Sequence, residues 1–269
     1  MTKCVVFYSG GLASYAAAER AIQMYGKGNT VLLFTDTKTE DEDLYRFLKK
    51  TQTDLDVPLV WLADSRDIWQ VFRDERRLGS SRADPCSKIL KRAQGDRWLK
   101  ANRDPADTVL VFGIDWTEKH RYDDGKGRGL KHRWAERGWT AIAPLTEPPF
   151  LWRQDIIAGL ATRGIEPPRL YALGFAHNNN CGGGCVKAGI GHFAHLLRAL
   201  PEVYAKWEHE EAEFNRMIRA GKSPVAMLSD RRGGRRVPYT LAQLRADLDA
   251  GRPVKGLDDV GGCGCFIED

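Results

Sequence analysis

The sequence predicts an α/β protein with a doubly wound parallel sheet, followed by a C-terminal subdomain that is helical and carries cysteines. Short apolar strands alternate with helices in the first part of the chain, which is typical of parallel strands joined by crossover helices. The first strand ends in a glycine turn that opens a helix. Helices and paired cysteines dominate later, so we expect an α/β domain at 1–166 and a helical region at 167–269.

The opening stretch, residues 4–22, is expected to form a strand, a tight turn and a helix. Glycine lets the backbone take positive φ, and the first N–H groups of a helix, with its positive dipole end, attract anions. Two serine hydroxyls add donors at the same place. The candidate phosphate-binding residues are Ser9, Gly10, Gly11, Leu12, Ala13 and Ser14.

Further strands and helices are expected in alternation. The expected strands after the first are 31–35, 57–63 and 108–116. One expected helix carries Leu44, Phe47 and Leu48 on one face. The further expected helices are 67–75, 85–101, 152–164, 192–221 with a break at Pro201, and 240–251. Ligands of such sheets bind at the carboxyl ends of the strands. The glycine turn, the turn at Asp36 and the turn at Gly113 should therefore face one cleft.

Composition bounds the class of protein. The 269 residues are 42% hydrophobic, no run approaches the roughly 20 apolar residues of a membrane span, and no signal-peptide segment precedes the first strand. We therefore expect a globular cytoplasmic protein without a membrane partner. The net charge is +5, and arginines cluster at 73–77, 128–137 and 231–236. These clusters either form a solvated surface or contact the phosphates of a nucleotide or a nucleic acid.

The turn S-G-G-L-A-S resembles the pyrophosphatase loop (PP-loop) of the adenine nucleotide α-hydrolase (HUP-type) superfamily, written SGG-x-[DA]-S. The stretch 34–37 is similar to the D-T-G segment of phosphoadenosine phosphosulfate (PAPS) reductase-like proteins, many of them from phages, although Lys38 replaces the glycine. The resemblance implies ATP and Mg²⁺ as cofactors, cleavage of ATP between its α and β phosphates, and Asp36, Thr37 and Gly113 beside the nucleotide.

Residues 113–121 resemble the family's motif G-[IL]-x-x-x-E-x-x-R, which implies catalytic roles for Glu118 and Arg121. A surface ion pair is the alternative for these two residues. The glycine-rich basic stretch 123–134 is expected to be a loop that acts as a lid or orders the substrate. Residues 139–145 are similar to a short strand of the family.

The cysteines form the second informative pattern. Cys4 falls in the first strand and is expected to be a buried small residue, and the others fall in loops at Cys86, Cys181, Cys185, Cys263 and Cys265. A cytoplasmic protein keeps such cysteines reduced, which favours a metal or redox role. The histidines near Cys181, at 177, 192 and 195, are expected to pack or cap rather than to act in catalysis.

Three interpretations of the cysteines stay open. Resemblance to the iron–sulfur sulfonucleotide reductases implies a [4Fe-4S] cluster on Cys86, Cys181, Cys185 and a tail cysteine such as Cys263. The paired spacings fit a Zn²⁺ site at Cys181, Cys185, Cys263 and Cys265. The third interpretation is thiols without a metal.

The resemblance implies an ATP-dependent enzyme that adenylates a substrate and releases pyrophosphate, with sulfur transfer to a nucleotide, tRNA or DNA component. One alternative is a sulfonucleotide (APS/PAPS) reductase, in which Cys265 or Cys263 would be the nucleophile. The other is a subunit that binds nucleotide or nucleic acid without catalysis. Beyond an adenine nucleotide, a sulfur-donor protein and a second copy of the chain remain open as partners.

Overall fold

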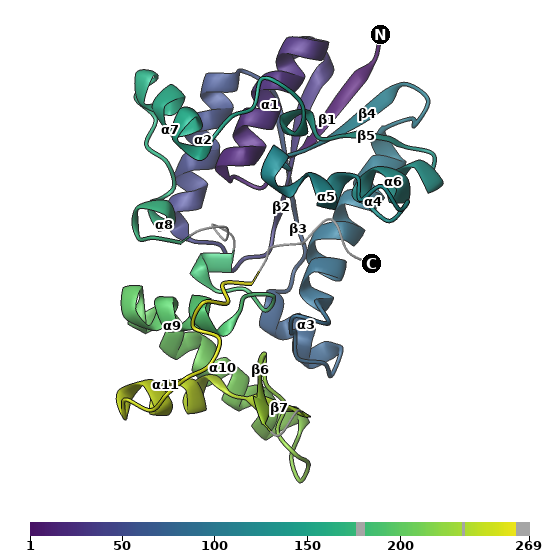
Figure 1. Ribbon diagram of the computed structural model, residues 1–269. Coiled ribbons are helices and arrows are strands. Elements are labelled where there is room, and N and C mark those ends of the chain that lie inside the picture. Colours follow the sequence, from purple (N-terminus) through teal and green to yellow (C-terminus); the bar gives the residue numbers. More distant parts are fainter. Residues whose placement is uncertain (176–180, 233–234, 262–269) are drawn as a thin grey trace.

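The computed structural model describes residues 1–175, 181–232 and 235–261, and its centre is a five-stranded parallel sheet (Figure 1). The strands are β1 (Lys3–Phe7), β2 (Thr30–Asp36), β3 (Leu59–Ala63), β4 (Thr108–Phe112) and β5 (Thr140–Ile142). Their order is β3-β2-β1-β4-β5, and every neighbouring pair is parallel. The predicted α/β class and parallel sheet are confirmed.

Helices cover both faces of the sheet. The helices are α1 (Leu12–Tyr25), α2 (Glu42–Leu55), α3 (Ile68–Asp74), α4 (Ala93–Asn102), α5 (Lys119–Tyr122), α6 (Leu130–Glu136), α7 (Arg153–Thr162), α8 (Arg169–Ala172), α9 (Ile190–Ala199), α10 (Pro201–Ile218) and α11 (Leu241–Asp249). A π-helix, η2 (Ser87–Arg92), leads into α4, and short 3₁₀ turns are η1 (Lys27–Asn29), η3 (Trp116–Glu118), η4 (Pro144–Thr146) and η5 (Cys181–Gly183).

Alternate residues of β1 enter two different cores, because successive side chains of a strand point to opposite faces. Cys4 and Val6 pack with α1, α2 and α7, whereas Val5 and Phe7 pack with α4 and α6. The Cys4 thiol is fully buried, as expected, and burial raises its pKa to about 12. This double covering is what a doubly wound sheet requires.

A third core lies below the sheet in Figure 1 and joins α3, η2, α9, α10 and α11. At its centre, Trp207 of α10 meets Trp69 of α3 edge to face, with ring centroids 4.9 Å apart. The core also takes in Cys86 and Leu90, which precede residue 167. The helix expected to begin at Pro201 is confirmed.

Three local predictions need correction. The stretch 123–134 is not a loop throughout, because α6 begins at Leu130. The helix expected over 85–101 begins as a π-helix. The basic stretch before α11 was not expected to contain strands, but it forms an antiparallel hairpin of β6 (Leu228–Arg232) and β7 (Arg235–Tyr239).

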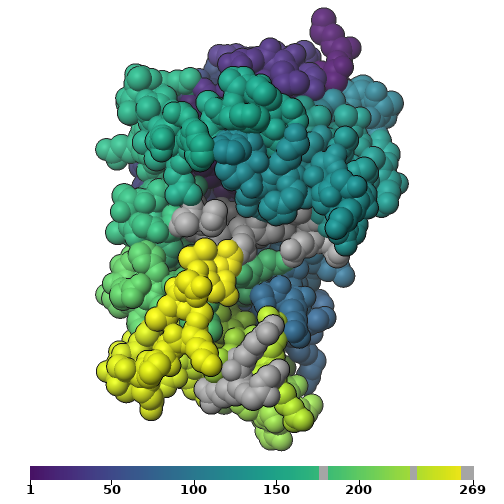
Figure 2. All heavy atoms as spheres, viewed as in Figure 1, coloured from purple at the N-terminus to yellow at the C-terminus, as the bar shows by residue number. Residues whose placement is uncertain are grey.

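The end of the described chain returns to the middle of the molecule, where Figure 2 shows it in yellow across the lower helices. The amide of Gly191 donates to the carbonyl of Asp259 at 2.8 Å. Gly261 is so close to the segment 187–189 that a Cβ built on it would lie 2.5 Å from the carbonyl oxygen of Lys187. In the described parts of the chain, no helix is long and apolar enough to cross a membrane.

Candidate functional site

The glycine turn lies where the order of the sheet reverses. The chain moves outward from β1 through β2 to β3, then crosses to β4 and β5 on the other side of β1. Such a reversal leaves a crevice beyond the carboxyl ends of the two central strands, which is where open α/β sheets bind ligands. Residues 9–11 follow β1 directly and so lie at this crevice.

The geometry of the turn suits an anion. Gly10 has φ of +76°, and a Cβ on it would lie 2.5 Å from a methyl carbon of Leu44. The hydroxyls of Ser9 and Ser14 are 3.3 Å apart, and Ser14 also donates to the carbonyl of Gly11 at 2.8 Å. Gly11 is the N-cap of α1 and provides no side-chain acceptor for the first N–H groups of the helix. Both predicted serines therefore converge on the positive end of α1.

The turn after β4 packs directly against the same helix end. A Cβ on Gly113 would lie 2.6 Å from the backbone nitrogen of Ser14, so no larger residue fits without moving α1. The two turns are therefore adjacent. The glycine is explained by this approach of backbone to backbone, whereas the sequence analysis assigned it to the nucleotide.

Tyr171 is a residue of this cleft that sequence reasoning missed. Its hydroxyl lies 3.4 Å from the backbone nitrogen of Leu12, the first residue of α1, and 3.3 Å from where a Cβ on Gly11 would be. The guanidinium of Arg153 lies 5.4 Å from the centre of its ring. A tyrosine distant in sequence gives no local signal of such a contact.

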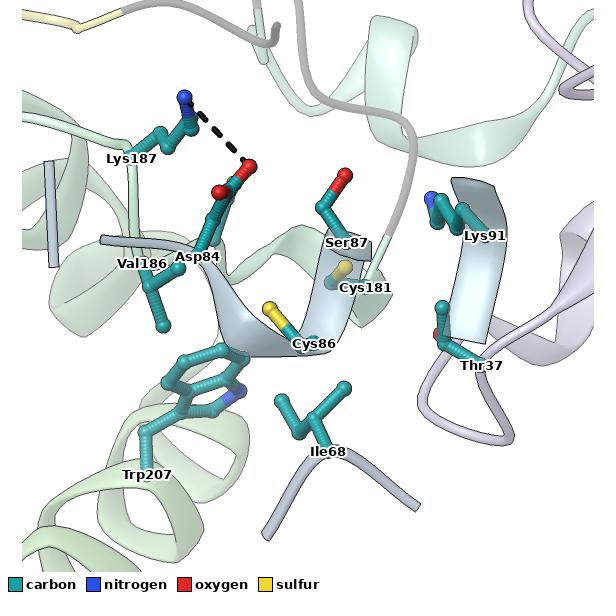
Figure 3. Close-up of a pocket in the computed structure, with 11 residues that line it drawn as sticks. Thr37, Ile68, Asp84, Cys86, Ser87, Lys91, Cys181, Val186, Lys187 and Trp207 are labelled. Carbon is teal, nitrogen blue, oxygen red and sulfur yellow. Dashed lines mark ion pairs between the residues drawn. The ribbon is translucent and has the colours of Figure 1, made fainter. Parts of the chain in front are cut away.

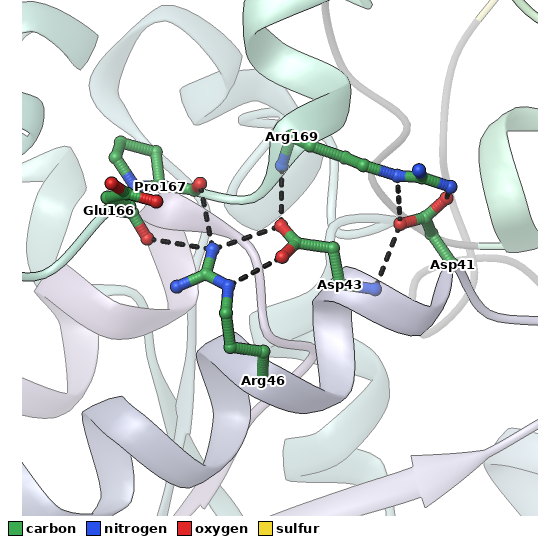
Figure 4. A network of polar contacts seen from close by, with 6 residues as sticks. All are labelled: Asp41, Asp43, Arg46, Glu166, Pro167 and Arg169. Carbon is green, nitrogen blue, oxygen red and sulfur yellow. Dashed lines mark hydrogen bonds and ion pairs between the residues drawn. The ribbon is translucent and has the colours of Figure 1, made fainter.

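A network of polar contacts holds the Tyr171 helix, α8, against the start of α2 (Figure 4). The guanidinium of Arg169 donates to both oxygens of Asp41 at 2.9 and 2.8 Å, and its backbone nitrogen donates to Asp43 at 2.7 Å. Arg46 binds Asp43 and reaches the carbonyls of Glu166 and Pro167, both at 3.1 Å. The network therefore sets where Tyr171 meets the glycine turn.

The predicted nucleotide residue Asp36 ends β2, and the protein itself binds its carboxylate. It accepts hydrogen bonds from the amide of Lys38 at 2.7 Å, from Tyr45 at 2.9 Å and from the indole of Trp61 at 3.2 Å. The next residue, Thr37, donates its hydroxyl to Glu40 at 2.9 Å. In this structure Asp36 shapes the turn.

Glu118 and Arg121 lie beyond β4 and pair with each other, as their spacing of three residues predicted. Both side chains are partly buried, at 31% and 21% exposure. Nearby, Trp116 packs edge to face on Trp152, with centroids 4.6 Å apart. The ion pair is in place, and a catalytic role for either residue stays a prediction.

Three of the predicted metal ligands line one pocket (Figure 3). Cys86 precedes the π-helix, and Cys181 and Cys185 flank a glycine loop; all three side chains are buried. The pocket is partly open and its cavity volume is about 20 Å³, and Thr37 also lines it. Because Thr37 follows Asp36, the cysteine pocket adjoins the carboxyl edge of the sheet.

The backbone around these cysteines is unusual in two places. Cys181 has φ of +60°, a left-handed conformation that a residue other than glycine rarely adopts and that often marks functional sites. The π-helix after Cys86 is likewise rare and frequent at functional sites. Its wider turn leaves Ser87 and Lys91, four residues apart, both lining the pocket.

Two buried ion pairs flank the pocket. Lys91 lies 3.7 Å from Glu40, and Lys187 lies 3.5 Å from Asp84, as Figure 3 shows for the second pair. Sequence reasoning missed all four residues, because isolated lysines and acidic runs are typical of solvated surfaces.

Glu40 connects the two halves of the site. Its carboxylate accepts from the amide of Cys181 at 2.5 Å as well as from Thr37, and its side chain is only 1% exposed. Burial raises the pKa of Glu40 above the usual range of a glutamate, while Lys91, the Cys181 amide and Thr37 oppose that rise. One carboxylate therefore ties the turn after β2 to the cysteine loop.

The histidines near the cysteines are packing residues, as expected, where they are described. The ring of His192 lies 2.6 Å from the carbonyl of Gly183, inside the cysteine loop, and His195 lies 2.8 Å from the carbonyl of Leu173. His177 lies outside the described residues, and so do Cys263 and Cys265. Among the residues that are described, no group of three or more His, Cys, Asp or Glu is arranged to hold a single metal ion.

No model of a known protein family matches the chain, and no curated protein matches its sequence. Among solved structures, the chain is similar to a phosphoadenylyl-sulfate (PAPS) reductase from Candida auris in a phosphate complex. The sequence identity is 14% and the TM-score is 0.45, and the similarity covers 65% of this chain and 80% of that one. It is also similar to an NH3-dependent NAD synthetase from Campylobacter jejuni subsp. jejuni in complex with a nitrate ion. The sequence identity is 13% and the TM-score is 0.40, and the similarity covers 81% of this chain and 84% of that one. Both likenesses are distant, so the function must be inferred from the chain's own site.

Proposed function

We propose that this protein is a cytoplasmic PP-loop enzyme that uses ATP and Mg²⁺ to adenylate a substrate, releases pyrophosphate, and transfers sulfur to a nucleotide or nucleic-acid component. One observation carries the proposal: Thr37 lines the cysteine pocket and directly follows the end of β2, so an anion-binding crevice and a set of buried cysteines share one edge of the sheet.

The glycine turn supports the adenylation step. In that step a substrate oxygen attacks the α phosphorus of ATP, the bond to the bridging oxygen breaks, and pyrophosphate leaves with the negative charge. The first N–H groups of α1, which Gly11 does not cap with a side chain, and the hydroxyls of Ser9 and Ser14 are donors that this leaving group needs. A sulfur nucleophile then displaces AMP from the adenylated substrate.

The cysteine pocket supports the sulfur step. Cys86, Cys181 and Cys185 provide three thiol ligands, and Gly261, two residues before Cys263, packs against the segment that follows Cys185. Each thiolate of a [4Fe-4S] cluster binds a different iron, so the sulfurs need not meet at one point as they do around zinc. The donor set therefore fits a cluster, which when bound would hold or relay sulfide.

The test of the adenylation step is nucleotide binding and pyrophosphate release. Ser9→Ala with Ser14→Ala should weaken ATP binding at least tenfold in calorimetry, since each lost hydrogen bond to a charged group costs about 1.5–3 kcal/mol. Ser223→Ala, an exposed serine outside the crevice, is the matched control. Unchanged affinity in the double variant would refute the phosphate-loop assignment.

The test of the sulfur step is metal analysis after anaerobic purification. We expect near-equal iron and acid-labile sulfide with visible absorption, both lost in Cys181→Ala with Cys185→Ala and retained in Cys4→Ala. A colourless protein with stoichiometric zinc, lost in the same variant, would replace the cluster with a structural zinc site and leave adenylation as the reaction.

A further inference from the structure

Three aromatic side chains lie together at the surface, and adenylation at the glycine turn gives them no role. Phe150 and Trp152 are 50% and 53% exposed, although large aromatic side chains are buried on average. Both contact Trp116, whose ring centre is 5.4 Å from that of Phe150 and 4.6 Å from that of Trp152. We call these three residues the aromatic platform. Exposed apolar groups that gather in this way mark a surface where something binds.

The platform is held in place by hydrogen bonds to the backbone that carries it. The indole nitrogen of Trp116 donates to the carbonyl of Leu151, the residue between the two exposed rings, at 3.2 Å. Arg20 of α1 donates to the carbonyl of Glu147 at 2.9 Å, which ties the loop before Phe150 to that helix. Because the rings are already fixed, little entropy is lost when a ligand covers them.

The platform lies beside the glycine turn and is connected to it from two sides. Trp116 is three residues after Gly113, which packs on the backbone at the start of α1. On the other side, Arg153 follows Trp152 and its guanidinium lies over the ring of Tyr171. The hydroxyl of that tyrosine approaches the first amide of α1. A molecule bound on the platform would therefore lie next to the helix end where the proposed adenylation occurs.

A basic surface begins at the same place. Residues 116–137, which include α5 and α6, contain seven lysines and arginines and four acidic residues, and residues 88–103, which include α4, contain six and one. These helices lie side by side in Figure 1, and the guanidinium of Arg137 lies 2.7 Å from the carboxylate of Asp96 of α4. Eight of the thirteen basic side chains are exposed, so the surface attracts a chain of phosphates.

Exposed rings beside exposed cations are the combination that binds single-stranded nucleic acid, because rings stack on bases while cations follow the backbone. In a duplex the bases are stacked on one another and cannot reach such rings without being unpaired.

We propose that the aromatic platform stacks on an unpaired base of a single-stranded nucleic acid, which is the acceptor of the proposed reaction. The inference rests on the proposed function for the reaction, but binding of the strand does not require ATP. RNA and DNA offer the same kind of base, and the 2′-hydroxyl distinguishes them.

The test is binding of fluorescent oligonucleotides of about 12 nucleotides, one RNA and one DNA of the same mixed sequence, measured by anisotropy without ATP. Trp152→Ala should lower the affinity for the single strand about tenfold, since a base loses its stacking partner. Trp152→Phe should keep most of the affinity, because its ring still stacks. Phe150→Ala is a second variant with the expectation of Trp152→Ala. Met24→Ala, which removes an equally exposed apolar side chain from α1, is the control and should change nothing.

The two strands identify the acceptor. Tighter binding of RNA or of DNA names it, and equal binding means that the base alone is recognised, as proposed. The same oligonucleotide paired with its complement measures the electrostatic contribution, so Trp152→Ala should leave its affinity unchanged.

Several results would overturn the proposal. They are an unchanged affinity for single strands in both alanine variants, an equal loss for the duplex, or a large fall in melting temperature in both variants. Weaker ATP binding in Trp152→Ala would place the adenine of ATP on the rings instead, and loss of a dimer in sedimentation would place a second copy there. Failure of the proposed function looks different: Ser9→Ala with Ser14→Ala would keep its ATP affinity, and the oligonucleotide results would stand.

Discussion

Glu211 should make the stability of the protein depend on pH in a direction opposite to that of most carboxylates. It lies on α10, is 2% exposed, and accepts hydrogen bonds from the amides of Met227 at 2.9 Å and Leu241 at 2.7 Å. Burial raises the pKa of Glu211 from 4.5 to about 7; the two amides oppose this rise, and Glu208 adds to it.

The sign follows from the proton balance. A folded-state pKa above the unfolded value means that the folded protein binds the proton more tightly, so the stabilisation is complete below pH 4.5 and is lost as the pH rises through about 7. The gap between these two values corresponds to about 3 kcal/mol of unfolding free energy. We expect most of this loss between about pH 5 and 8.

Urea denaturation followed by tryptophan fluorescence at pH 5, 6, 7 and 8 measures this loss. Glu211→Gln cannot ionise, so its stability should vary far less over the range. It should be about 1–3 kcal/mol less stable at pH 5, because its amide nitrogen faces one of the two backbone donors. Glu202→Gln, exposed on the same helix, should keep the full pH dependence. Equal slopes for the Glu211 variant and the unmodified protein would refute the reasoning.

Gly113→Ala should abolish nucleotide binding in calorimetry and lower the melting temperature, because its Cβ would lie 2.6 Å from the backbone of Ser14; a variant that binds normally would show that α1 can shift. Glu40→Ala should cost about 3–5 kcal/mol of unfolding free energy in urea, since it removes one member of a buried ion pair. A cost below 1 kcal/mol would mean that water reaches the pair. Tyr171→Phe should keep the fold by circular dichroism and tighten ATP binding severalfold, because its hydroxyl would no longer compete for the first amide of α1; weaker binding would instead make the hydroxyl a ligand of the phosphates.

The sheet and the glycine turn were predictable from sequence because their signals are local. Apolar runs of four or five residues between helices specify buried parallel strands, and the turn S-G-G in that position needs only its neighbours to be interpreted. The meeting of Gly113 with α1 also follows from topology.

The contacts that complete the site are not local, and the sequence did not reveal them. Glu40 stands in an acidic run that reads as the solvated start of a helix, yet it is buried against Cys181 and Lys91. Tyr171 is 159 residues from the amide it approaches. The β6–β7 hairpin was not predicted, because arginines and glycines hide the alternation of apolar and polar residues that normally predicts strands.

The π-helix after Cys86 has a further consequence for how the pocket could be lost. A π-helix is rare, and its i→i+5 hydrogen bonds fit one more residue into each turn than an α-helix does. Deleting one residue from the segment 87–92 would therefore restore regular bonding while rotating Asp84 and Cys86 about 100° around the helix axis relative to α4. The shortened chain would gain helix stability and lose the alignment of its thiols. A point substitution cannot have this effect, because it leaves the number of residues in the helix unchanged.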